Sequence, residues 1–165
     1  AQIVALERRE AVVDGLTFYE VVTLTRLSGG IADNVVPDRA TATLNLRYPP
    51  DRTPEEAEAY LRTLVPAGAT LEVVSNAPPG AVVTSSPVVQ ALRRAGDLEV
   101  EPKQAWTNVA DFTSRDLDAV NFGPGHTAYA HRRDERVEIA ALVHAYETLR
   151  RLLAGGTCGI SEDGA

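Results

Sequence analysis

The chain has 165 residues, a hydrophobic content of 44%, a charged content of 24% and a formal net charge of −7. This composition is typical of an ordinary soluble globular domain, and no apolar run approaches the roughly 20 residues of a membrane span. Because the negative charge is spread along the chain, nucleic acid is not expected as a partner. The single Cys158 cannot form an internal disulfide, so we expect a cytoplasmic protein.

The first half of the sequence alternates between helix and strand patterns. Residues 1–10 resemble the last turns of a helix, and the Asp14-Gly15 pair predicts a turn. Two segments predict strands, 18–27 and 39–48, and the second alternates apolar with polar side chains, so one of its faces is expected to be covered. A helix is predicted after them, with Thr53 as its N-cap and Pro54 in its first turn.

A further strand is predicted over residues 69–75, which completes an antiparallel-type sheet with helices on one face. The fold class expected is therefore α/β, with a two-layer α/β sandwich in residues 1–78. The loop at 76–87 is the expected domain boundary, and residues 79–156 form the second part.

The second part predicts two helices and one buried strand. The first helix follows Ser86 as its cap and ends near Gly96, and the strand covers residues 118–125. The second helix covers residues 137–155 and ends at Gly155. Its expected core face is formed by large side chains at helical spacing: Ile139, Leu142, Val143, Tyr146, Leu149 and Leu153. Residues 157–165 are expected to be a mobile tail.

Three histidines are the first candidates for chemistry. His131 follows a Gly-Pro-Gly turn, and the Asp134-Glu135 pair behind it could orient its imidazole. A histidine at such a position is more often a solvated surface residue. His126 is expected to be exposed, and His144 to be structural or solvated. Because the sequence holds no HxxxH, HxD or CxxC pattern, a complete transition-metal site cannot be written from this chain.

Four further residues could contact a ligand, and each also has a structural interpretation. Arg47 lies on the polar face of its predicted strand, where its guanidinium could bind a carboxylate or simply face solvent. Asn34 could donate to a ligand carbonyl or serve as a turn residue. Thr107 follows the only tryptophan, Trp106, in a segment that could line a pocket or pack in the core. Gly123 stands in a glycine turn whose backbone amides could approach an anion.

The order of three motifs adds a family resemblance. "SGGIADNVVPDRATATLNLRYPPDRTPEEA", "AWTNVADF" and "VNFGPGHTAYAHRRDERVEIAAL" follow one another along the chain. This series resembles the co-catalytic zinc aminoacylase and carboxypeptidase family, and within it the succinyl-diaminopimelate desuccinylases of the actinobacterial type. The resemblance covers residues 1 to about 154 and implies that an inserted lid domain, which also forms a homodimer, is followed by the last stretch of a catalytic domain.

The resemblance also implies roles for single residues. His131 matches a zinc ligand of the family, in a site that holds two zinc ions, or cobalt or manganese in their place. Asn34 and Arg47 match lid residues that hold the carbonyl and the carboxylate of the substrate, and Thr107 and Gly123 match pocket residues of the catalytic domain. The implied activity is amide hydrolysis of an N-acyl amino acid, such as N-succinyl-diaminopimelate in amino-acid biosynthesis.

The same resemblance implies that the other zinc ligands and the general base belong to an N-terminal half that precedes this sequence. We therefore expect the 165-residue chain alone to be inactive, with no catalytic residue of its own. Two positions depart from the family pattern: Leu27 replaces a lid histidine, and Asp111 replaces a pocket arginine. A free-standing dimerisation or ligand-binding module is the alternative function, and a degenerate family member is a third.

Overall fold

The computed structural model describes residues 8–155, which form two compact units. Unit 1 contains the described residues up to Val82 together with Pro102–Ala110, and unit 2 contains Val83–Glu101 and the described residues from Asp111 onward. Most of the helix expected over residues 1–10, and the whole tail at 157–165, lie outside the described residues. Where the first of these predictions can be checked it is wrong, because Arg9 begins a strand.

The sheet of unit 1 has three antiparallel strands in the order β1-β2-β3, which are Arg9–Val13, Leu16–Gly29 and Ala40–Arg47. Asp14 and Gly15 connect β1 to β2 with positive φ angles of 49° and 77°. Two successive left-handed residues match the twist of a tight hairpin, which is why an Asp-Gly pair suits this turn. The strands predicted at 18–27 and 39–48 are thus confirmed, although β2 is longer than expected.

Strand β2 is long because it pairs with β1 along its first part and with β3 along its second part. Its first five residues pair with β1, from Leu16↔Val13 to Glu20↔Arg9. Its remaining residues pair with β3, from Val21↔Arg47 to Gly29↔Ala40, with a register shift between Leu24 and Arg26. The second edge of β2 is therefore open to other groups along residues 16–20.

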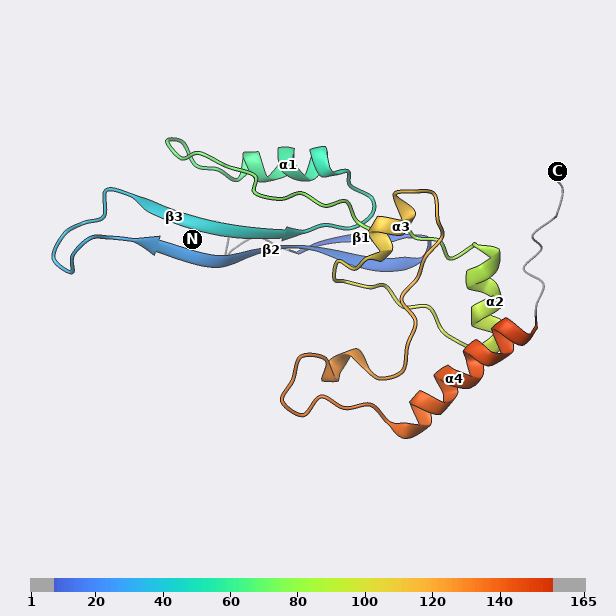
Figure 1. Ribbon diagram of the computed structural model, residues 1–165. Helices are drawn as coiled ribbons and strands as arrows, with labels where there is room; N and C mark the ends of the chain where they lie inside the picture. The colour runs from blue at the N-terminus through green and yellow to red at the C-terminus, as the bar shows by residue number, and fades with distance from the viewer. Residues whose placement is uncertain (1–7, 156–165) are drawn as a thin grey trace. The chain divides into compact units, whose positions relative to one another are not determined.

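Helix α1, Pro54–Thr63, begins as its sequence predicts. The hydroxyl of Thr53 accepts a hydrogen bond from the Glu56 amide, and the Glu56 carboxylate accepts one from the Thr53 amide. The helix lies along one side of the sheet (Figure 1), where Ala57 is buried, as are Ala11 and Phe18 of the sheet. A small antiparallel sheet with helices confirms the expected mixed α/β class.

The strand predicted at 69–75 is wrong: this segment follows α1 as irregular structure, with Val74 exposed. Its β-branched side chains favour a strand, but a strand also needs the edge of another strand to pair with. Among the described residues, the ladder partner of β3 is β2 alone. Local preference was therefore not sufficient here.

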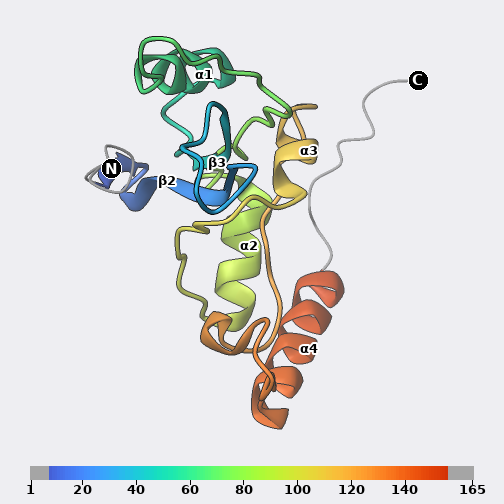
Figure 2. The ribbon, with the colours of Figure 1, turned by 90° about the vertical axis from the view of Figure 1, so that its left-hand side faces the viewer.

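Unit 2 is built around two helices, α2 (Pro87–Gly96) and α4 (Ile139–Ala154), which pack side by side (Figure 2). The predicted start after Ser86 is correct, but the Ser86 side chain makes no capping hydrogen bond. The prediction that α4 ends at Gly155 is confirmed. The chain also forms α3 (Val109–Thr113) and a short 3₁₀ helix, η2 (Thr127–Tyr129). No helix within residues 8–155 is long and apolar enough to cross a membrane.

The face of α4 that packs on α2 is not the face predicted. Ala145 and Thr148 are buried, whereas every member of the expected core face is exposed. The reason is the close approach at Gly96, where an added Cβ would lie 2.5 Å from the Thr148 Oγ1. Such a close contact requires small side chains, so the large apolar residues lie on the exposed face of the helix.

The buried strand predicted at 118–125 is also wrong. The segment has no regular structure and is mostly exposed, including Val120. Within the part of unit 2 that the structure describes, no strand lies beside it. Its backbone groups therefore have no ladder to join.

Candidate functional site

His131 lies in a loop of unit 2 between η2 and α4. Its φ angle is +63°, a left-handed conformation that is uncommon for residues other than glycine. The Glu135 carboxylate accepts a hydrogen bond from the His131 backbone amide over 3.1 Å. That contact closes the loop over five residues and leaves the imidazole exposed.

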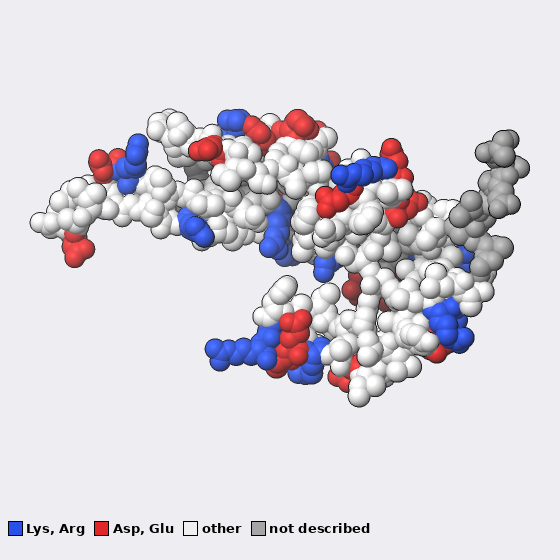
Figure 3. All heavy atoms as spheres, viewed as in Figure 1, with Lys and Arg blue, Asp and Glu red and all other residues white. Residues whose placement is uncertain are grey.

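The two acidic residues behind His131 do not take the role predicted for them. Glu135 bonds the backbone of His131, and Asp134 forms ion pairs with Arg132 at 2.9 Å and Arg136 at 3.2 Å. The Arg136 guanidinium also stacks 4.0 Å from the centre of the Tyr129 ring. Figure 3 shows acidic and basic atoms close together on this loop. The pair therefore shapes the loop and does not orient the imidazole through a hydrogen bond to its ring.

The other two histidines are exposed and lie in separate places. The His126 Nδ1 accepts a hydrogen bond from the Ala128 amide, which makes this residue the cap of η2. His144 lies in α4, where its carbonyl accepts the Thr148 hydroxyl. Within residues 8–155, no three His, Cys, Asp or Glu side chains are grouped so that they could hold a metal ion. The described residues do not fit a complete zinc site, and no reaction step can be derived through a metal here.

Arg47 is the last residue of β3 and is exposed, opposite Val21 of β2. No carboxylate among the described residues pairs with its guanidinium. An unpaired guanidinium at a strand end can take a ligand carboxylate without first breaking an ion pair. The position is therefore compatible with the role predicted for Arg47.

Asn34 lies in the loop that joins β2 to β3, beyond the Gly29↔Ala40 pair, and is exposed. Arg47 lies at the opposite end of the same two-stranded ribbon. At ~3.3 Å per residue the seven steps from Ala40 to Arg47 span about 23 Å. One small ligand cannot contact Asn34 and Arg47 of the same chain.

The two remaining predicted residues fall in different units. Thr107 is half-buried in the segment 102–110 of unit 1, and its carbonyl accepts the Ala110 amide at 3.1 Å. Gly123 belongs to unit 2, is exposed, and has open space where a Cβ would stand. Their roles as pocket residues stay predictions, as do those of Asn34, Arg47 and His131.

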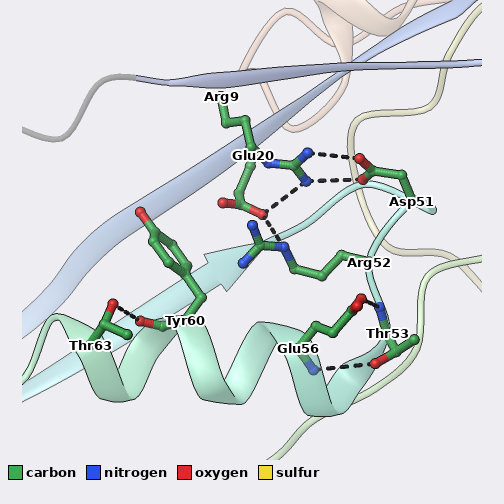
Figure 4. A network of polar contacts seen from close by, with 8 residues as sticks. All are labelled: Arg9, Glu20, Asp51, Arg52, Thr53, Glu56, Tyr60 and Thr63. Carbon is green, nitrogen blue, oxygen red and sulfur yellow. Dashed lines mark hydrogen bonds and ion pairs between the residues drawn. The ribbon is translucent and has the colours of Figure 1, made fainter.

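A charge network that the sequence did not reveal joins the sheet to the start of α1 (Figure 4). Glu20, which is 4% exposed, pairs with Arg9 at 3.2 Å and with Arg52 at 3.0 Å. Arg9 also holds both oxygens of Asp51, at 2.7 and 2.9 Å, and Arg52 lies 4.8 Å from the centre of the Tyr60 ring. Two positive and two negative groups thus compensate one another around a nearly buried carboxylate.

Electrostatics within this network agree with the geometry. The hydrogen bond from Arg9 lowers the pKa of Asp51, and the same pairing raises the pKa of the Arg9 guanidinium. Glu20 is one residue before Val21, the ladder partner of Arg47. The network therefore fixes the backbone on both sides of the strand end that carries Arg47.

A second anchor of this region, also missed in the sequence, is Gln104. Its amide oxygen accepts the Tyr19 backbone N–H at 3.1 Å, and its amide nitrogen donates to the Thr17 carbonyl at 2.9 Å. No local sequence signal could have revealed it, because its partners lie more than 80 residues earlier in the chain.

Comparison with known proteins identifies relatives along most of the chain. Residues 3–70 match the peptidase dimerisation domain of the M20 class. The chain is 36% identical over 148 residues to a protein of Mycobacterium tuberculosis named as a succinyl-diaminopimelate desuccinylase. It is 30% identical over 162 residues to the succinyl-diaminopimelate desuccinylase of Corynebacterium glutamicum, and 28% identical over 144 residues to the acetylornithine deacetylase of Myxococcus xanthus.

These matches cover much of this chain but less than half of each relative. They take in 89%, 93% and 82% of the chain, and 42%, 43% and 38% of the three relatives in the same order. The chain thus spans about two fifths of the length of the curated relatives it matches.

Proposed function

Because this chain belongs to the M20 family of peptidases, whose dimerisation domain its residues 3–70 match, we propose that it is part of a hydrolase of N-acyl amino acids. N-succinyl-diaminopimelate is the proposed substrate. The observation that carries the proposal is the match of nearly the whole chain to two relatives named as desuccinylases of that compound. A cytoplasmic location belongs to the same proposal.

Arg47 supports an acidic substrate. Its exposed guanidinium can offer two parallel N–H groups to a carboxylate, a geometry that lysine cannot reproduce. The charge network beside it keeps the end of β3 in place, so the guanidinium can be positioned before a ligand arrives. Asp111 is exposed in α3 and would repel a dicarboxylate wherever the two came close.

His131 would supply one imidazole nitrogen to a metal centre. The remaining ligands and the general base would come from outside the described residues, because these hold no cluster that could complete the site. Zinc, when bound, activates water and polarises the scissile carbonyl. The chain's own contribution is a loop that keeps the imidazole exposed, since Glu135 holds the backbone of His131.

A homodimer through the dimerisation domain is part of this proposal. Asn34 and Arg47 cannot reach one ligand in one chain, because they lie at opposite ends of the β2-β3 ribbon. In a dimer both residues can contact one ligand, if Asn34 of one copy reaches the ligand that Arg47 of the other copy holds. Dimerisation would then be required for substrate binding.

The test uses the longest reading frame that contains this chain. The purified protein is assayed for zinc content and for hydrolysis of N-succinyl-diaminopimelate and N-acetylornithine, with His131→Ala beside it. We expect both metal content and turnover to fall in that variant. His144→Ala is the matched control, because His144 is also exposed and lies in unit 2, and it should keep both.

Three outcomes would contradict parts of this proposal. A protein without zinc and without hydrolysis would favour the free-standing binding or dimerisation module. Hydrolysis of N-acetylornithine alone would keep the enzyme class and reject the succinyl substrate. Equal metal content in His131→Ala and the parent protein would remove His131 from the metal site.

A further inference from the structure

The side chain of Gln104 occupies the open edge of strand β2. Residues 16–20 of β2 pair with β1 on one edge, and the pairing with β3 begins only at Val21. On the other edge, Gln104 accepts the Tyr19 N–H and donates to the Thr17 carbonyl. A carboxamide has one donor and one acceptor side, so it can replace a neighbouring peptide group in a ladder.

A second contact holds the same segment a few residues further along. Gly80 lies so close to Val109 that an added Cβ would stand 2.9 Å from the Val109 Cγ1 and 3.3 Å from the Ala110 backbone nitrogen. Ala110 is buried, with 3% of its surface exposed. The absence of a side chain at Gly80 therefore allows the start of α3 to pack against the irregular segment that follows α1 in unit 1.

Trp106 and Thr107 lie between these two anchors. The segment is short, so fixing its two ends limits the positions that both residues can take. Trp106 is 54% exposed, which means that it does not anchor the segment by burial in the core. Its placement therefore depends on the contacts of the residues on either side of it, among them Gln104 and Val109.

We propose that Gln104 is a positioning residue, which ties the Trp106-Thr107 segment to β2 of the dimerisation domain so that Thr107 is presented to the substrate. The inference rests on the proposed function for the role of Thr107. The connection of this segment to β2, here called the tie, rests on the two hydrogen bonds of Gln104 and on the packing at Gly80. Through these contacts, a displacement of the sheet would also displace Thr107.

The tie is tested on the 165-residue chain by amide hydrogen exchange and by quenching of Trp106, the only tryptophan. Gln104→Leu removes both hydrogen bonds at similar side-chain size. Exchange of the Tyr19 amide should become about threefold to tenfold faster, the range expected for the loss of one partly exposed hydrogen bond. Acrylamide should quench Trp106 more strongly.

Two control variants distinguish loss of the Gln104 hydrogen bonds from a general loss of stability. Gln104→Glu keeps an acceptor for the Tyr19 N–H but places a carboxylate oxygen against the Thr17 carbonyl, so Tyr19 should be less protected than in the parent protein and more protected than in Gln104→Leu. Lys103→Leu changes an exposed neighbour that has no hydrogen bond or ion pair within the part of the chain that the structure describes, and it should leave Tyr19 and Trp106 unchanged. Unchanged Tyr19 exchange in Gln104→Leu, or equal acceleration in Lys103→Leu, would overturn the inference.

The functional part is measured on the longest reading frame that contains this chain. Gln104→Leu should raise KM about threefold to tenfold while kcat changes less than twofold, because a displaced Thr107 weakens binding more than chemistry. An unchanged KM with normal hydrolysis would refute the inference and leave the proposed function intact. Absence of hydrolysis in the parent protein would refute the proposed function, while the exchange experiment would still decide the tie.

Discussion

The close contact between α2 and α4 gives a sharp prediction for Gly96→Ala. A Cβ at this position would lie 2.5 Å from the Thr148 Oγ1, 2.7 Å from the Thr148 Cγ2 and 3.0 Å from the Leu98 Cδ2. Thr148 cannot easily yield, because it is fully buried and β-branched, and its hydroxyl donates to the His144 carbonyl at 2.8 Å. One element of the pair must therefore move.

The expected loss of stability follows from two opposing effects. Overpacking of this kind costs ~1–3 kcal/mol, whereas alanine in place of a helical glycine gains ~0.5–1 kcal/mol. Since the methyl group would meet two atoms of a fixed side chain, we expect a net loss of about 2 kcal/mol. Urea unfolding followed by far-UV circular dichroism measures it, because unit 2 has helices as its only regular elements among the described residues.

A control glycine and a second substitution test whether the contact with Thr148 causes the loss of stability. Gly123→Ala adds the same methyl group where no atom lies within 4 Å and φ is not positive, so the change should stay within ~0.5 kcal/mol. Thr148→Ala in the Gly96→Ala background removes the clashing atoms, and the coupling between the two sites should reach about 1–3 kcal/mol. A Gly96→Ala protein as stable as the parent would refute the argument.

Two further predictions concern the charge network of unit 1. Glu20→Gln leaves Arg9 and Arg52 without their shared charged partner and should lower the free energy of unfolding by about 1–3 kcal/mol. Glu58→Gln, at a half-buried position, breaks a surface pair with the exposed Arg62 and should lower it by less than ~0.5 kcal/mol. Equal urea midpoints for the two variants would contradict the buried role of Glu20. Asp51 has a pKa below its unfolded value because Arg9 bonds it, so its contribution is complete above the unfolded pKa and is lost as the pH falls through the lowered folded pKa. The urea midpoint of Asp51→Asn should therefore lie below that of the parent protein at pH 7, and the gap should narrow at about pH 3; a gap independent of pH would argue against the ion pair.

The elements predicted correctly are those whose ends depend on neighbouring residues. The Asp14-Gly15 turn, the capping box of Thr53 and Glu56, and the end of α4 at Gly155 are each decided within a few residues. The alternation of residues 39–48 likewise marks a strand wherever an edge is available. These features could be predicted because local backbone geometry limits which residues fit them.

The motifs also sufficed to indicate the family, whereas the arrangement of the candidate residues could not be obtained in that way. The register of β2 with β3 places Arg47 and Asn34 at opposite ends of one ribbon. The left-handed turn at His131 allows Glu135 to bond the backbone of that residue and not its ring.

Three predictions failed because they depended on partners distant in the chain. Residues 69–75 and 118–125 have strand-like composition, but no strand edge accepts them among the described residues. The large apolar residues of α4 match a core face, yet Gly96 selects the small face with Ala145 and Thr148. The sequence by itself determined the Asp14-Gly15 turn, the start of α1 and the end of α4, because those depend on local geometry. Only the tertiary structure decided which faces are buried and which charges meet, because those depend on close contacts between residues far apart in sequence.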